Sequence, residues 1–250
     1  MTPTLARESL RMTTRQQEWL ALALLTALAT VVFEIWPMLD LAFSQLFFKQ
    51  GAFEGSQWAW AKLLYHGMPI VGGLLSAAAL WVVLARLLKR LAGRPQTATW
   101  LWRRAVLSLL VVVLGVGLLV HDGFKDNWGR ARPMDVQAFG GSKVYHAPLR
   151  PTDQCERNCS FVSGHAAGGF ALMAIGMLGS RRTRWRWWSA GMATGGLVGL
   201  ARIVEGRHFL GDIVFAGLLI WAVCLLLREA WLRIKRWTAR RPASVGGSSR

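Results

Sequence analysis

Acidic residues are scarce in this sequence. Its 250 residues contain 13 Asp plus Glu against 30 Lys plus Arg, which leaves a formal net charge of +17. Such an excess of basic residues is typical of proteins that contact nucleic acid or an anionic membrane surface. Charge is absent from long runs such as residues 105–120, 53% of the residues are apolar, and the chain contains 14 tryptophans. Uncharged runs of this length predict membrane-spanning helices, so the basic charge indicates a membrane partner and no nucleic acid.

Two further absences bear on the organisation of the chain. It has no internal repeat and no low-complexity tract longer than the final SVGGSSR, which predicts a single domain over residues 1–250. No small-residue cleavage site follows the first apolar run, and that run is long for a signal peptide. We therefore expect the first run to be retained as a membrane span.

Cysteine is rare, with three residues in the chain. Cys224 lies inside an apolar run, where it is expected to pack as a small hydrophobic side chain. Cys155 and Cys159 occur in the sequence CERNC. An oxidising compartment would permit a disulfide between them, and a metal-binding pair is the alternative. Two thiols without nearby ligands make a weak metal site.

Six apolar segments predict an all-α, polytopic membrane bundle with about six transmembrane helices. A helix that crosses about 30 Å of hydrocarbon needs roughly 20 mostly apolar residues. The fourth and fifth segments are short and rich in Gly and Ala, which would let neighbouring helices pack closely. The predicted spans are residues 19–39, 63–85, 104–121, 164–180, 187–204 and 209–227.

These spans define a core at about residues 19–227, and we expect both ends of the chain to be flexible. Residues 41–56, between the first two spans, are too short to cross a bilayer. They are expected to form either an interfacial helix, with phenylalanines in the headgroup zone, or a loop that covers the bundle.

The distribution of Lys and Arg predicts the orientation in the membrane. The N-terminus, residues 86–104, residues 181–187 and the tail after Leu227 fall on one side of a six-span bundle and carry most of the basic residues. That side is predicted to be cytoplasmic, with both termini in the cytoplasm and the chain in a bacterial inner membrane. Residues 121–163 and 205–208 would then face the periplasm.

Residues suited to catalysis gather in three segments that this topology places at the periplasmic face. The segments are KDNWGRARP at 125–133, CSFVSGHAAGG at 159–169 and ARIVEGRHFLGD at 201–212. Three cations, two imidazoles and a carboxylate on one surface form the set that phosphoryl transfer without a metal needs. The candidate residues are Lys125, Arg132, Ser163, Gly164, His165, Arg202, His208 and Asp212.

Several of these residues suit contacts to a phosphate. Lys125 supplies a point charge, whereas Arg132 and Arg202 can each donate two hydrogen bonds to phosphate oxygens. Ser163 and Gly164 precede an expected helix whose first N–H groups have no internal partner and can bind an anion.

The remaining three residues suit nucleophilic and acid–base chemistry. His208 and Asp212 are four residues apart and would share one face of a helix. Asp212 is therefore expected to hold one ring nitrogen of His208 and to leave the other free to attack. His165 lies on a different helix and could protonate the leaving oxygen.

The three segments resemble the type 2 phosphatidic acid phosphatase superfamily. Its pattern is Lys, six residues, Arg-Pro; then Pro-Ser-Gly-His; then Ser-Arg, five residues, His, three residues, Asp. The first element is complete here, whereas Val162 replaces the proline of the second and Ala201 replaces the serine of the third. The resemblance covers the motifs and the six-span layout, about residues 19–227.

This resemblance implies a membrane lipid phosphatase that hydrolyses a phosphate monoester or diphosphate without a metal or another cofactor. By the same resemblance, His208 is the nucleophile and forms a phosphohistidine, Asp212 orients it, and His165 is the general acid. The residues expected to hold the phosphoryl oxygens are Lys125, Arg132, Ser163, Gly164 and Arg202.

Two stretches, CERNCSFVSGHA and FGGSKVYHAPL, resemble the lipid A 1-phosphatase branch of the family. Undecaprenyl diphosphate phosphatase and phosphatidylglycerophosphatase are the rival activities. An alternative of another class is a non-catalytic membrane protein that binds anions. That alternative does not explain why His165, His208 and Asp212 accompany the cations. The oligomeric state is left open.

Other polar residues near this face have no catalytic role in the family pattern. Arg130, Arg207 and Asp126 are interpreted as loop electrostatics. Three histidines are interpreted as bystanders or as groups that shape the substrate site: His66, His121 and His146.

Overall fold

The computed structural model describes residues 12–95 and 99–240 of the chain. The ends that the sequence predicts to be flexible lie for the most part outside these ranges, at residues 1–11 and 241–250. Helices dominate the described residues, and four of them are long and apolar enough to cross a membrane. The predicted class, an all-α membrane bundle, is confirmed.

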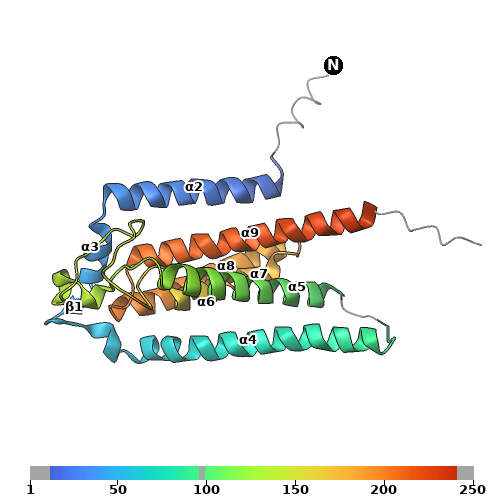
Figure 1. Ribbon diagram of the computed structural model, residues 1–250, viewed down its shortest axis with the longest axis horizontal. Helices are drawn as coiled ribbons and strands as arrows, with labels where there is room; N and C mark the ends of the chain where they lie inside the picture. The colour runs from blue at the N-terminus through green and yellow to red at the C-terminus, as the bar shows by residue number, and fades with distance from the viewer. Residues whose placement is uncertain (1–11, 96–98, 241–250) are drawn as a thin grey trace, which may run out of the picture.

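The four long helices run side by side along the molecule (Figure 1). Many of their leucine, isoleucine and tryptophan side chains are exposed, as expected for helices that face hydrocarbon. One of the four consists of an α-helix, α5, that continues directly as a π-helix, η2. The four are α2 (Thr14–Ile35), α4 (Ala59–Leu91), α5 (Thr99–Leu110) with η2 (Val111–Lys125), and α9 (Leu210–Arg240).

The predicted fourth span, residues 164–180, is wrong as one continuous helix. Two short helices occupy it, α6 (Gly164–Phe170) and α7 (Met173–Gly176). Together they cover about 17 Å at 1.5 Å per residue, less than the roughly 30 Å of hydrocarbon in a bilayer. The predicted fifth span lies within α8 (Arg181–Val204), which is long but does not have the apolar composition of the other four.

Small residues let α6 and α8 approach each other closely. A side chain on Gly169 would meet the backbone of Gly195 at 2.7 Å, and one on Gly195 would overlap the ring of Phe170. The glycines that weaken these segments as hydrophobic spans are therefore used for helix packing.

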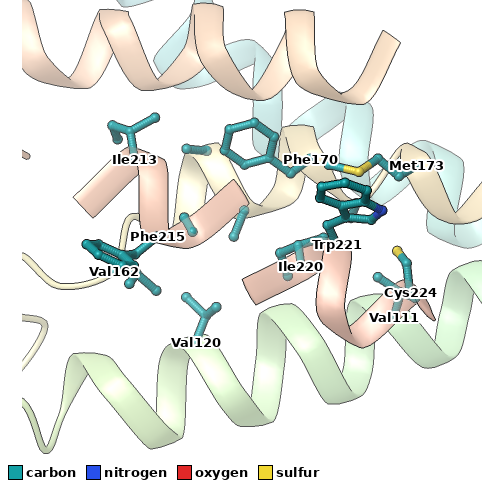
Figure 2. Close-up of a cluster of buried hydrophobic side chains, with 14 of the residues drawn as sticks. Val111, Val120, Val162, Phe170, Met173, Ile213, Phe215, Ile220, Trp221 and Cys224 are labelled. Carbon is teal, nitrogen blue, oxygen red and sulfur yellow. The ribbon is translucent and has the colours of Figure 1, made fainter. Parts of the chain in front are cut away.

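The hydrophobic core is centred on α9. Figure 2 shows Ile220 and Cys224 of α9 near Val111 and Val120 of η2, with Phe170 nearby. All five side chains are buried. Because the first turn of α9 also carries Asp212, this packing holds one candidate site residue firmly in place.

The segment between the first two long helices is neither one interfacial helix nor a plain loop. After α2 ends at Ile35, the chain forms α3 (Leu39–Gln45). A short antiparallel hairpin follows, made of the two-residue strands β1 (Phe48–Lys49) and β2 (Ala52–Phe53). A 3₁₀ turn, η1 (Glu54–Gln57), leads into α4. The first helix stops before its predicted end because the residue before Pro37 is disfavoured in helical conformation.

This segment packs on the chain that links α8 and α9. A side chain on Gly55 would overlap Val204, and one on Gly206 would overlap the ring of Phe53. Gly206 also has a positive φ of 67°, which glycine adopts without strain. Two further 3₁₀ turns lie in the chain between η2 and α6. They are η3 (Pro133–Asp135) and η4 (Gln137–Phe139).

One end of the bundle carries α3, the hairpin, the end of η2 and the start of α9 (Figure 1). We call it the site end. The opposite end carries the starts of α2, α5 and α8 and the ends of α4 and α9. It is rich in arginine, and we call it the basic end.

Candidate active site

The three motif segments meet at the site end. Arg202, Lys125 and Arg132 all act electrostatically on His165, and Lys125 and Arg202 act also on His208. Cations from η2, the following loop and the end of α8 therefore lie near His165 of α6, and those from η2 and α8 also lie near His208. The spatial clustering expected from the motifs is present in the structure.

His208 is 1% exposed and lies between α8 and α9. Its Nδ1 is 2.7 Å from the backbone carbonyl oxygen of Ser160, whereas the nearest oxygen of Asp212 is 3.7 Å away. The predicted contact between Asp212 and the ring is present at ion-pair distance, and the carbonyl of Ser160 makes the closer hydrogen bond to the same nitrogen. Because a carbonyl can only accept, Nδ1 carries the hydrogen and Nε2 keeps a free lone pair. Burial lowers the pKa of His208 to about 3, so the ring is neutral at pH 7.

Asp212 acts on His208 through its neighbours. Its Oδ2 accepts hydrogen bonds from the Ser160 hydroxyl at 2.5 Å and from the Phe209 backbone N–H at 2.8 Å. Ser160 supplies the carbonyl that binds His208, and Phe209 follows His208 in the chain. One carboxylate thus holds both the residue that binds the ring of His208 and the backbone next to His208. Ser160 had no signal in the sequence, because its contact to the ring uses a backbone atom.

The sequence interpretation assigned Arg130 to the general charge of the loop, and the structure gives it a specific buried position instead. It is fully buried and forms ion pairs with Asp212 and with Asp40 of α3, the second at 2.6 Å. Its Nε donates to the carbonyl oxygen of His146 at 2.9 Å, and its guanidinium lies 4.4 Å from the ring centre of Phe209. The sequence shows three cations in KDNWGRARP but not which of them turns inward.

Tyr65 of α4 is a second residue that the motifs did not indicate. Its ring centre lies 5.0 Å from that of His165, and the guanidinium carbon of Arg202 lies 4.4 Å above it. Tyr65 therefore joins the candidate acid to a candidate phosphate ligand. Burial, with Arg202 and Lys125 nearby, lowers the pKa of His165 to about 4.

Arg202 is 5% exposed and forms an ion pair with Glu205. Its Nε is buried and has no hydrogen-bond partner among the described residues. A buried donor without a partner is costly, and an anion in the site would satisfy it. This geometry fits the expected role of Arg202 as a phosphate ligand.

The other two cations contact one short loop. Lys125 donates to the side-chain oxygen of Asn158 at 3.1 Å, and Arg132 donates to the Asn158 carbonyl oxygen at 2.6 Å. The loop is closed by a disulfide between Cys155 and Cys159, whose Cα atoms are 5.7 Å apart. The disulfide is thus part of the support for both cations. Cys224, by contrast, is buried in the core as a free cysteine.

The start of α6 is tightly enclosed. Ser163 is buried, and its hydroxyl accepts the N–H of Ala166 at 3.5 Å. A side chain on Gly164 would meet the ring of His121 at 3.0 Å and the Cε of Lys125 at 3.2 Å. A larger residue at this position would push on His121 and Lys125, so the small size of glycine lets both pack directly on its backbone.

The remaining polar residues lie around this centre. Asp126 accepts the backbone N–H of Asn158 at 3.0 Å, and the ring of His66 lies 4.7 Å from that of Tyr65. His146 contributes its carbonyl to Arg130, while its own ring faces the carbonyl of Val144.

A family model described as the PAP2 superfamily matches residues 104–236, just over half of the chain. The chain belongs to the PAP2 superfamily. The match includes all three motif segments but neither Asp40 nor Tyr65.

Three curated proteins are similar to the chain, each named lipid A 4′-phosphatase. The protein from Francisella tularensis subsp. novicida is 39% identical over 132 residues, covering 50% of this chain and 60% of the relative. The one from Rhizobium leguminosarum is 31% identical over 126 residues, or 49% and 54%. The one from Rhizobium etli is 26% identical over 221 residues, or 80% and 82%. The chain therefore spans 60% and 54% of the first two relatives. No solved structure matches the chain.

Proposed function

We propose that this PAP2 protein is a membrane lipid phosphatase that removes a phosphate from lipid A. The observation that carries the proposal is His208, a buried neutral imidazole whose Nδ1 is bound to a carbonyl and whose Nε2 is free to attack. The three relatives named above act on the 4′-position by name. We therefore favour the 4′-phosphate over the 1-phosphate that the local sequence resemblance suggested.

In the proposed first step, the Nε2 lone pair of His208 attacks the phosphorus atom. A nitrogen–phosphorus bond forms, the bond from phosphorus to the sugar oxygen breaks, and His165 gives its proton to that oxygen. Burial and the nearby cations both lower the pKa of His165 and so disfavour its protonated form. A bound phosphate dianion offsets this repulsion, so substrate binding favours the acid form.

In the proposed second step, water attacks the phosphorus of the phosphohistidine. His165 takes a proton from the water, the nitrogen–phosphorus bond breaks, and inorganic phosphate leaves. Throughout both steps the negative oxygens are stabilised by fixed cations. Lys125 and Arg202 are almost fully buried, where charge–charge interactions are stronger than in water.

A cavity of about 670 Å³ beside the phosphate ligands supports a bulky polar headgroup as the substrate. Arg132 and Arg202 open into it, and Arg207 adds a third arginine that is not part of the family pattern. Arg207 is close enough to act electrostatically on both of the others. A sugar headgroup that carries more than one anionic group fits such a cavity better than an acyl chain does.

The basic loops support an inner-membrane location with the site at the periplasmic face. Arg15 in the first turn of α2 and the arginines in the first turns of α8 belong to the basic end, whereas His208 lies between the end of α8 and the start of α9, at the site end. In a bacterial inner membrane the basic end is cytoplasmic by the usual Lys/Arg bias. A lipid phosphate would then reach His208 from the outer leaflet while its acyl chains stay in hydrocarbon.

The test is phosphate release by purified protein in detergent, with EDTA present, from lipid A, undecaprenyl diphosphate and phosphatidylglycerol phosphate. We expect release from lipid A, loss of release in His208→Ala, and full release in the control His146→Ala, whose ring is outside the hydrogen-bonded centre. Mass spectrometry of the product assigns the phosphate lost to the 1- or the 4′-position. Equal release by wild type and His208→Ala would leave only a non-catalytic anion-binding protein.

A further inference from the structure

We infer that Asp40 is a positioning residue for His208, acting through Arg130 and Asp212. This inference rests on the proposed phosphatase function. Asp40 belongs to α3, which the family model does not match, so this chain's N-terminal part would complete a site whose reacting groups all lie in the matched part.

The first step of the argument is burial. Asp40, Arg130 and Asp212 are each 0% exposed, so the ion pairs between them are screened by no water. Removing one member of a buried pair strands the other charge, which is far more costly than losing a surface pair. The guanidinium therefore holds the two carboxylates in one arrangement.

The second step is the number of contacts that fix Asp40. Its Oδ1 accepts the backbone N–H of Gly211 at 2.7 Å, next to Asp212 in the chain. The hydroxyl of Tyr145 lies 3.4 Å from Asp40 and donates to the carbonyl of Pro37 at 2.5 Å. Asp40 thus binds the first turn of α9 directly and also through Arg130, so α3 cannot shift without moving Asp212.

The third step connects Asp212 to the reacting atom. Asp212 holds the hydroxyl of Ser160, and the carbonyl of Ser160 holds Nδ1 of His208. A displaced Asp212 would therefore loosen the contact that keeps the hydrogen on Nδ1 and the lone pair on Nε2. Loss of this orientation lowers the rate of attack without removing any phosphate ligand.

The experiment measures kcat and KM for lipid A in Asp40→Asn, normalised to folded protein. The side chain keeps its size but loses its charge, so we expect kcat to fall about 10- to 100-fold with KM little changed. The matched control is Glu34→Gln, which removes the acid of an exposed ion pair with Arg150 at the same end and should leave kcat unchanged. Folded Asp40→Asn protein with the wild-type kcat would overturn the inference.

A second variant decides the matter if Asp40→Asn does not fold. Asp40→Glu keeps the charge but moves the carboxylate outward by one methylene. A purely structural role predicts the full kcat per folded molecule, which would overturn the inference, whereas a positioning role predicts a reduced kcat.

A readout independent of activity separates this inference from the proposed function. The nitrogen NMR signals of His208 report which ring nitrogen carries the hydrogen, and the chain has five histidines, so assignment with His208→Ala is practical. We expect wild type to hold the hydrogen on Nδ1 and Asp40→Asn to populate both forms. Wild type that releases no phosphate would refute the proposed function alone, whereas identical His208 signals in the two proteins would refute the role of Asp40.

Discussion

Two buried arginines tie the N-terminal helices to α9, one at each end of the bundle. At the site end, Arg130 pairs with Asp40 and Asp212, and all three side chains are 0% exposed. At the basic end, Arg228 is 3% exposed and pairs with Glu18 of α2 and with Glu229, which are 22% and 15% exposed. Nε and one terminal nitrogen of Arg228 lack a hydrogen-bond partner among the described residues, whereas none of the nitrogens of Arg130 does.

The two ion pairs differ in whether their contacts lead to the candidate nucleophile, His208. Arg130 is held on every side, and its partner Asp212 reaches His208 within two hydrogen bonds. Arg228 has partners that water can partly solvate, and none of its ion pairs within residues 12–95 and 99–240 joins it to a motif residue. The chemistry of the two pairs is the same, so their surroundings decide what each pair does.

The largest effect is expected for Arg130→Met. The change strands two buried carboxylates, which should cost about 3–5 kcal/mol in the free energy of unfolding. Because Asp212 then loses its main partner, we also expect kcat to fall by about 100-fold or more. Thermal unfolding in detergent and lipid A hydrolysis measure the two quantities. An active, stable Arg130→Met protein would remove the distinction between the two ends.

Acid should weaken the site end before the basic end, because all five histidines lie at or near the site end. The pKa of His208 is about 3 in the folded protein and near 6.5 when unfolded, so the unfolded state binds more protons between these values. Stability is therefore complete above pH 6.5 and falls as the pH is lowered, by up to about 1.4 kcal/mol per pH unit. Thermal unfolding from pH 7.5 to pH 5 tests this, and His208→Ala should show a shallower dependence. An equal slope in both proteins would contradict the burial argument.

Tyr65→Ala tests the ring between the candidate acid and a phosphate ligand. Its stacking on Arg202 should be worth about 1 kcal/mol, which corresponds to roughly fivefold in kcat/KM. Tyr65→Phe keeps the ring and is the matched control, with an expected kcat/KM close to wild type. A large loss in Tyr65→Phe would show instead that the hydroxyl is the important group.

The disulfide loop should have a smaller effect, limited to binding. Replacing Cys155 and Cys159 by serine frees the loop whose Asn158 contacts Lys125 and Arg132, at a cost of about 2 kcal/mol at most. We expect a higher KM for lipid A with an unchanged kcat. A reducing agent should reproduce this change in wild type and do nothing to the double variant. A fall in kcat would place the loop closer to the chemistry than the structure does.

The smallest effect on catalysis is expected for Arg228→Met, the counterpart of the first variant. Its partners remain partly solvated, and two unsatisfied nitrogens are removed, so the stability loss should be about 1–2 kcal/mol. We expect kcat to stay at the wild-type value. A loss of kcat comparable to that of Arg130→Met would show that the basic end also controls the site.

Sequence patterns were sufficient for features that depend on composition and local spacing. Uncharged runs predicted the long helices, and the three motifs predicted a cluster of cations and imidazoles, which the structure brings together. The fourth span was misjudged because glycines lower hydropathy and favour close packing at once, and composition does not separate these effects.

The sequence by itself determined the membrane class, the family and the candidate site residues, because apolar length and motif spacing are properties of the chain read in order. Only the tertiary structure decided that Arg130 is buried while Arg132 is not, that Asp40 lies against it across 90 positions, and that a Ser160 carbonyl sets the tautomer of His208. These contacts depend on burial and on backbone atoms, and neither depends on residue type alone.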